Sequence, residues 1–95
     1  GKHRHAAGTP AWYRASFEAN PADGPLVFSP VGMTKGQVFI NGKHLCRYFV
    51  ATASGKRVPP QSEYVIPASW FQAGANEILL FDEHGGQASK CKLGR

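Results

Sequence analysis

The sequence predicts an all-β fold, an antiparallel sandwich or barrel, and three observations favour it. Short runs of β-branched and aromatic residues alternate with turn residues along most of the 95-residue chain. An Asn41-Gly42 pair stands between two of these runs, and both central residues of a type I′ hairpin turn need positive φ. Only residues 67–74 have room for one or two helical turns. A chain of this length forms one domain with a thin core.

The first strand is predicted over residues 12–19, whose side chains alternate between two faces. The expected core face consists of Tyr13, Ala15, Phe17 and Ala19. Residues 20–25 form a loop, because their two prolines cannot donate to a sheet and their Asp-Gly pair favours a turn. A short second strand follows over residues 26–28.

The hairpin is predicted from residues 36–41 and 44–49, with Val38 and Ile40 together on one face. Residues 50–62 are rich in small, polar and proline residues, which is typical of an exposed loop. A strand over residues 64–66 then ends at Pro67.

The last two strands are predicted over residues 76–83 and 88–93. The centre of the former, Ile-Leu-Leu-Phe, is apolar on both faces, which is typical of a strand buried between two layers. The latter carries two lysines and is expected at a sheet edge.

The net charge of +5 comes from basic residues that are scattered along the chain. Such a surface permits an acidic partner, yet a scattered distribution indicates first a solvated basic surface. Residues 35–40 only partly resemble an RNA-binding strand motif, and the long helices of that fold are missing, so we expect no specific nucleic acid. No apolar run approaches the length that crosses a bilayer, and we expect no membrane partner.

Catalytic and metal-binding patterns are missing from the sequence. Asp82 and Glu83 are the only neighbouring acids, and adjacent residues of a strand point to opposite faces. The four histidines lie in the N-terminal segment or beside turn glycines. We therefore expect no catalytic residues, no metal and no cofactor. Cys46 and Cys91 form no CxxC motif, and both a disulfide and two free thiols remain open.

Aromatic residues beside polar ones indicate carbohydrate binding, because a pyranose ring has a C–H face that stacks on an aromatic ring and hydroxyls that take hydrogen bonds. The alternative is that these aromatic residues belong to the core, as most do in a small sandwich. The candidate contacts are Phe39, Asn41, His44, Arg47, Tyr48, Phe49 and Trp70.

Two segments carry a family resemblance: residues 32–49, GMTKGQVFINGKHLCRYF, and residues 62–86, SEYVIPASWFQAGANEILLFDEHGG. Together they resemble the C-terminal jelly-roll, galactose-binding-like domain of family-35 glycoside hydrolases, the β-galactosidases. The order of the pieces from residue 12 to residue 86 fits that family. The chain departs from the family pattern at a few positions, namely Thr34 for Gly, Phe39 and Phe49 for Trp, Cys46 for Gly, and His84 for an aromatic residue.

The resemblance implies a jelly-roll β-sandwich, which we expect over residues 12–95. Residues 1–11 are expected to form a flexible N-terminal segment. The resemblance also implies a non-catalytic accessory domain that supports a catalytic domain or binds carbohydrate, since the family's catalytic glutamates belong to a separate barrel. An independent carbohydrate-binding or lectin-like module, and a structural or protein-interaction sandwich, are the alternatives. The expected partners are a galactoside, a plant or algal polysaccharide, or the parent enzyme's catalytic domain. We expect a monomer in a secreted, periplasmic or cell-wall setting.

Overall fold

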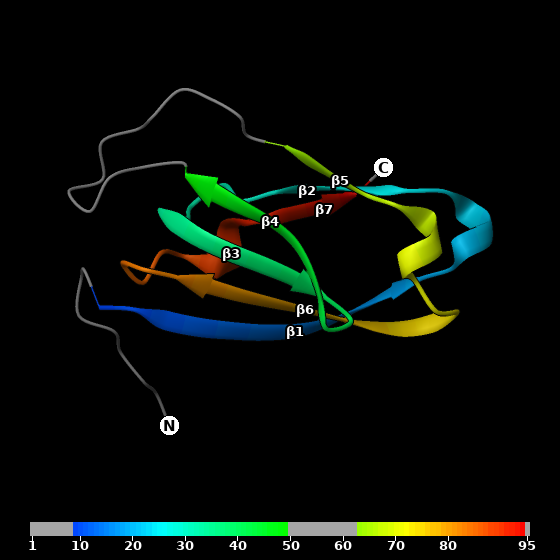
Figure 1. Cartoon of the computed structure of the whole chain (residues 1–95), viewed down its shortest axis with the longest axis horizontal. Helices are drawn as coiled ribbons and strands as arrows, with labels where there is room; N and C mark the ends of the chain where they lie inside the picture. The colour runs from blue at the N-terminus through cyan, green and yellow to red at the C-terminus, as the bar shows by residue number, and fades with distance from the viewer. Residues whose placement is uncertain (1–8, 50–62, 95) are drawn as a thin grey trace.

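The computed structural model describes residues 9–49 and 63–94, which form seven strands and three 3-10 turns (Figure 1). The strands are β1 (Ala11–Ala19), β2 (Leu26–Ser29), β3 (Lys35–Ile40), β4 (Lys43–Phe49), β5 (Tyr64–Ile66), β6 (Gly74–Asp82) and β7 (Lys92–Gly94). The 3-10 turns are η1 (Pro21–Asp23), η2 (Ala68–Trp70) and η3 (Ala88–Lys90). In the described ranges, no helix is long and apolar enough to span a bilayer.

Two antiparallel sheets make a sandwich, so the predicted all-β fold is confirmed. The strand order is β1-β6-β3-β4 in the four-stranded sheet and β5-β2-β7 in the three-stranded sheet. In Figure 1, β1 lies along the lower edge and β5, β2 and β7 lie at the top. Strand β6 runs between β1 and β3, so it joins the N-terminal strand to the hairpin.

The core lies between the sheets and follows the predicted alternation. Val38 and Ile40 of β3 are fully buried, and they face Phe28 and Ile66 of the other sheet in one apolar cluster. Tyr13, Phe17 and Ala19 pack against this cluster as predicted. Ala15 is the exception, because it is exposed beside an open groove between β1 and β7.

The hairpin has the predicted turn. Asn41 has a φ of 50° and Gly42 a φ of 83°, as a type I′ turn requires. The pairing register shifts between Val38, which pairs with Cys46, and Phe39, which pairs with His44. Leu45 is the additional residue of this β-bulge. A bulge reverses the alternation of a strand, and here it turns His44 and Arg47 to the same outward face although they are three positions apart.

Strand β6 differs from its prediction as a strand buried between two layers. Ile78 and Leu80 point into the core and are buried. Leu79 and Phe81 point outward and are only partly buried, and the Phe81 ring contacts that of Trp12. That prediction was wrong, because apolar residues on both faces of a strand can also mark one core face and one apolar surface.

The C-terminal strand begins later than predicted. Residues 88–90 form the turn η3, and only Lys92–Gly94 pair with β2. The predicted helical stretch forms one turn, η2, and the loop over residues 20–25 contains η1. Most of the predicted flexible segment 1–11 and all of the predicted loop 50–62 lie outside the described residues. Both Cys46 and Cys91 are free thiols.

Candidate functional site

A row of rings crosses the outward face of the four-stranded sheet, and we call it the aromatic platform. It consists of the rings of Trp12, Phe39, His44 and Phe81, together with the aliphatic side chain of Leu79 that lies among them. Register brings them together: Trp12 pairs with Phe81 across β1 and β6, and Phe39 pairs with Leu79 on one side and His44 on the other. The Trp12 ring centroid lies 4.7 Å from that of Phe81 and 6.5 Å from that of Phe39. The Phe39 and His44 centroids are 5.3 Å apart.

The platform is open to solvent. Trp12 is 58% exposed, His44 is exposed and the other members are partly buried. Four strands at the usual spacing give a width of roughly 14 Å. A contiguous apolar surface rimmed by polar side chains is typical of a binding site on a soluble domain.

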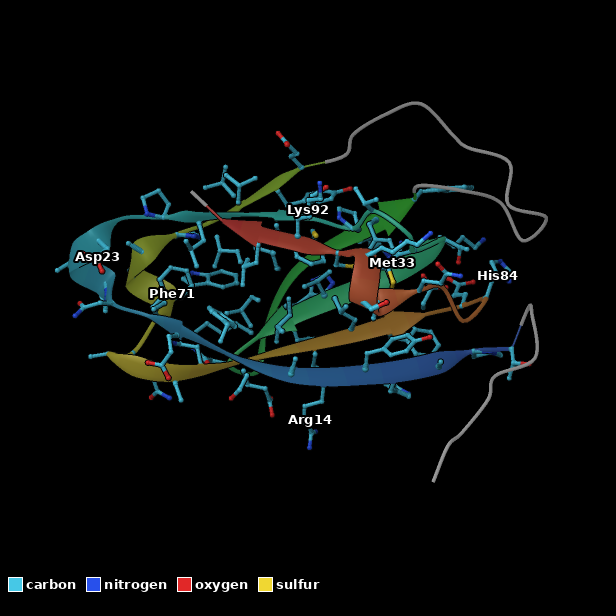
Figure 2. All side chains as sticks on the ribbon, turned by 180° about the vertical axis from the view of Figure 1, so that it is seen from behind. Arg14, Asp23, Met33, Phe71, His84 and Lys92 are labelled. Atoms are coloured by element: carbon cyan, nitrogen blue, oxygen red, sulfur yellow. The ribbon has the colours of Figure 1, made fainter. Side chains whose placement is uncertain are left out.

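Polar side chains surround the platform on the same face. Gln37 lies between Phe81 and Arg47 in the register. Arg14 lies opposite Leu79 and points away from the sandwich (Figure 2). Amide and guanidinium groups at these positions can donate hydrogen bonds to hydroxyls of a ligand that lies on the rings.

Four of the seven predicted contacts lie on this face, namely Phe39, His44, Arg47 and Phe49. The first three are at or next to the platform. Phe49 is 48% exposed at the end of β4, where the Lys35 Nζ lies 5.5 Å from its ring centroid. Trp70 belongs to η2 and is half-buried, with the Lys43 Nζ 5.7 Å from its ring centroid. It has no ring contact with the platform among the described residues.

Asn41 has a structural role in the fold. Its Nδ2 donates to the carbonyl oxygen of Trp70 and to Oδ1 of Asn76, at 2.9 and 2.8 Å, and its Oδ1 accepts from the backbone N–H of Glu77 at 2.9 Å. Asn76 is buried and in turn bonds Gln72 and Gly74. These bonds fasten the hairpin turn to η2 and β6. They occupy the Asn41 amide, so we leave Asn41 out of the proposed contact surface.

Tyr48 points into the core and is only 3% exposed. Its hydroxyl donates to Oδ2 of Asp82 at 2.9 Å and to the carbonyl oxygen of Phe81 at 3.1 Å. Burial raises the pKa of Tyr48, and the negative charge of Asp82 raises it further. Simple alternation from His44 would turn Tyr48 outward and Arg47 inward. The bulge at Leu45 reverses this order, so Tyr48 points into the core and Arg47 points outward. Tyr48 is therefore removed from the contact surface as well.

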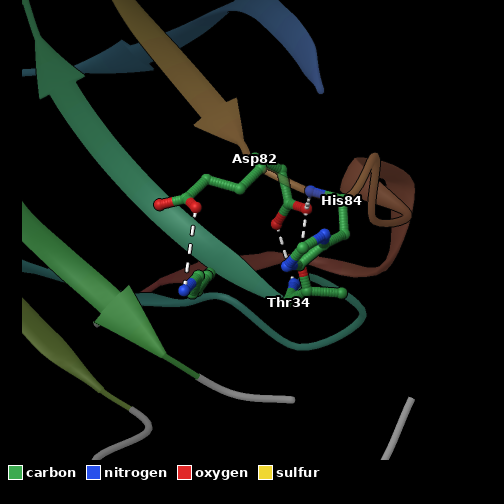
Figure 3. A network of polar contacts seen from close by, with 5 residues as sticks. Thr34, Asp82 and His84 are labelled. Carbon is green, nitrogen blue, oxygen red and sulfur yellow. Dashed lines mark hydrogen bonds and ion pairs between the residues drawn. The ribbon is translucent and has the colours of Figure 1, made fainter. Parts of the chain in front are cut away.

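Asp82 is fully buried and accepts five hydrogen bonds. Figure 3 shows those from Thr34 and His84. The donors are the backbone N–H and hydroxyl of Thr34, the hydroxyl of Tyr48, and the backbone N–H groups of His84 and Gly86. Burial raises the pKa of Asp82, but the bonds from Thr34, Gly86 and His84 outweigh it and hold the pKa below its ordinary value. Its neighbour Glu83 points elsewhere and pairs with Lys35, so the two acids do not form a pair, as the strand alternation predicted.

The residues predicted from the sequence as ligand contacts did not include Trp12, Gln37 and Phe81. The signal for Trp12 was present, because the alternation of residues 12–19 put it opposite the expected core face. The signal for Phe81 was the apolar second face of β6, which was interpreted as burial. No pattern in the sequence distinguishes Gln37 from any other solvated residue of a strand.

A groove of about 570 Å³ opens between β1 and β7, on the inner side of the four-stranded sheet. Its lining is largely apolar and includes Phe17, Phe28 and Leu93, and none of the predicted contacts lies in it. Among the described residues, no three His, Cys, Asp or Glu side chains gather where they could hold a metal ion. The aromatic platform is thus the site that best combines rings with hydrogen-bonding groups.

Comparison with known proteins identifies the fold's relatives. The family model for the galactose-binding domain of β-galactosidase matches residues 10–76. Beta-galactosidase 6 of Oryza sativa subsp. japonica is 30% identical over 82% of this chain and 12% of its own length. Beta-galactosidase 10 of Arabidopsis thaliana is 27% identical over 88% of this chain and 15% of its own length. Beta-galactosidase 11 of O. sativa subsp. japonica is 34% identical over 80% of this chain and 9% of its own length.

The chain therefore spans at most 15% of the length of these relatives. The matched family model describes a galactose-binding accessory module and not a catalytic domain. The resemblance drawn from residues 32–49 and 62–86 is confirmed, including its jelly-roll, galactose-binding-like character. The chain belongs to the galactose-binding domain family of the β-galactosidases.

Proposed function

We propose that this domain is a non-catalytic module that binds galactose-containing glycans on its aromatic platform. The observation that carries the proposal is the exposed ring of Trp12, which lies against Phe81 and faces Phe39 across one strand. The core does not require a tryptophan at position 12. The side chain there points outward, so a polar residue would serve the fold equally well. A sugar ring that stacks on Trp12 covers apolar surface that otherwise meets water.

Polar groups give the stacked sugar its orientation. Gln37 can donate and accept hydrogen bonds, and His44 provides an imidazole at the end of the ring row. The loss of tryptophan at position 39, relative to the family pattern, is offset by Trp12 on the neighbouring part of the same face. The family description supports galactose as the sugar, and the names of the relatives, β-galactosidases, support a β-galactoside.

The test is calorimetric titration of the domain with β-1,4-linked galacto-oligosaccharides. We expect millimolar or tighter binding, and we expect Trp12→Ala to reduce the affinity at least tenfold. Val65→Ala is the matched control, because Val65 is 61% exposed on β5 of the other sheet. His44→Ala is a second variant that removes an exposed ring without touching the core.

The melting temperatures of these variants check that folding is retained. If Trp12→Ala and Val65→Ala weaken binding equally, the ligand does not bind at the aromatic platform. No binding of any galacto-oligosaccharide at millimolar concentration would overturn the proposal.

The groove between β1 and β7 favours a second candidate function, support of a larger polypeptide. The relatives are several times longer than this chain, and an extended segment from such a polypeptide would cover the inner face of β1, where Ala15 is exposed. In a protein that joins this domain to a β-galactosidase catalytic part, Ala15→Arg would then increase proteolysis at the domain boundary without changing the melting temperature of the isolated domain. Unchanged proteolysis would exclude this role.

A further inference from the structure

Two carboxylates on the platform face are held in ion pairs. Arg14 Nε lies 3.1 Å from Oε2 of Glu77, and Lys35 Nζ lies 3.7 Å from Oε1 of Glu83. Each pair offsets a negative charge beside the rings. An anionic ligand on the platform would therefore meet little repulsion from these two acids.

Arg47 is different from these cations. It is exposed on β4, and in the part of the chain that the structure describes it has no ion pair or hydrogen-bond partner. It lies opposite Gln37, and Phe39 is the next residue of β3 on the same face. The bulge at Leu45 brings this guanidinium to the same face as His44. With respect to the described residues, an unpaired guanidinium thus adjoins the rings.

We propose that the aromatic platform selects an anionic glycan, whose carboxylate or sulfate group binds Arg47 while an adjacent sugar ring stacks on Phe39 and Trp12. This inference rests on the proposed function and names its ligand class. The planar guanidinium donates two parallel hydrogen bonds to a carboxylate or an oxyanion, which neutral hydroxyls do not match. The net charge of +5 adds a general attraction for such polymers.

The test compares three probes of similar length by calorimetric titration: neutral β-1,4-galacto-oligosaccharides, oligogalacturonides, and oligosaccharides of a sulfated galactan. We expect an anionic probe to bind about two- to fivefold more tightly than the neutral one, because one solvent-exposed ion pair contributes at most about 1 kcal/mol. Arg47→Gln should abolish this preference by lowering the affinity for the anionic probe to that for the neutral one. The probe that gains affinity tells whether the anion is a carboxylate or a sulfate.

Lys92→Gln is the matched control, because Lys92 is an exposed cation on β7 of the other sheet. If Lys92→Gln and Arg47→Gln reduce the preference for the anionic probe equally, the preference reflects net charge alone and the inference is overturned. Equal affinity for neutral and anionic probes would overturn it too, and would leave the galactoside proposal intact. If none of the three probes binds, both proposals fail.

Discussion

Asp82→Asn is the substitution with the clearest expected cost to stability. The buried carboxylate accepts bonds from Thr34, Tyr48, His84 and Gly86, and an asparagine can offer only one oxygen in place of two. With Nδ2 at the position of Oδ2, the Tyr48 hydroxyl can reverse its bond, but the backbone N–H of Thr34 then faces another donor. With Nδ2 at the position of Oδ1, the two N–H groups of His84 and Gly86 lose their acceptor.

The expected decrease in the free energy of unfolding follows from these lost hydrogen bonds. A buried donor without an acceptor costs about 1–3 kcal/mol, and the remaining bonds weaken because a neutral acceptor replaces a charged one. We expect Asp82→Asn to lower the free energy of unfolding by at least 3 kcal/mol. For a domain of this size that corresponds to a fall in melting temperature on the order of 15 °C.

The assay is urea unfolding monitored by tryptophan fluorescence. Glu83→Gln is the matched control, because it is the adjacent acid, is exposed and contributes one surface ion pair, so its cost should stay below about 1 kcal/mol. Equal and small losses in both variants would refute the role assigned to Asp82.

The pH dependence gives an independent check. The pKa of Asp82 is lower in the folded protein than its ordinary value of 3.8. Its contribution to stability is therefore fully present above that value and is lost as the pH falls below it, toward the folded pKa. The wild-type domain should lose stability over this acid range by a step that Asp82→Asn lacks.

Three further predictions concern the backbone and the thiols. Gly36→Ala should destabilise by more than about 2 kcal/mol, since the new Cβ would lie 1.7 Å from the carbonyl oxygen of Phe81, whereas Gly94→Ala, with nothing within 4 Å, should have little effect in the same urea assay. Gly42→Val should cost about 2 kcal/mol through its φ of 83° alone, because the position has no neighbour within 4 Å, and an unchanged melting temperature would contradict the turn assignment. Burial raises the pKa of Cys46 to about 11, and burial followed by the charge of Asp82 does the same for Cys91. Ellman's reagent at pH 8 should therefore react with the folded domain much more slowly than with the domain in urea.

The hairpin and the core could be predicted from the sequence because local rules determine them. Asn41-Gly42 permits few turn types, and the alternation around Val38 and Ile40 sets one face toward the core. The contact surface was harder to predict from the sequence, because it depends on the order of the strands in the sheet. Trp12 and Phe39 are distant in sequence and meet only because β6 lies between their strands.

Two structural roles were hidden from sequence reasoning for the same reason. The residue pattern does not predict the bulge at Leu45. Without the bulge, simple alternation puts Tyr48 on the same face as His44. Asn41 appeared available for a sugar, but its amide is bonded to Asn76, a partner that only the fold brings near. Polar residues next to aromatic ones therefore indicate a site only once their internal hydrogen bonds are known.

The position of β6 has a consequence for how the chain assembles. It is the sixth of the seven described strands to be synthesised, yet it is the only described neighbour of β1 and one of the two described neighbours of β3. Until residue 82 has left the ribosome, β1 and the hairpin have no shared partner strand. The β1–β6 and β3–β6 pairs that join them connect residues that are distant in the sequence. We expect slow folding, dominated by contacts distant in sequence. A chain that stops short of Gly74 would leave both earlier pieces with unpaired edges exposed to aggregation.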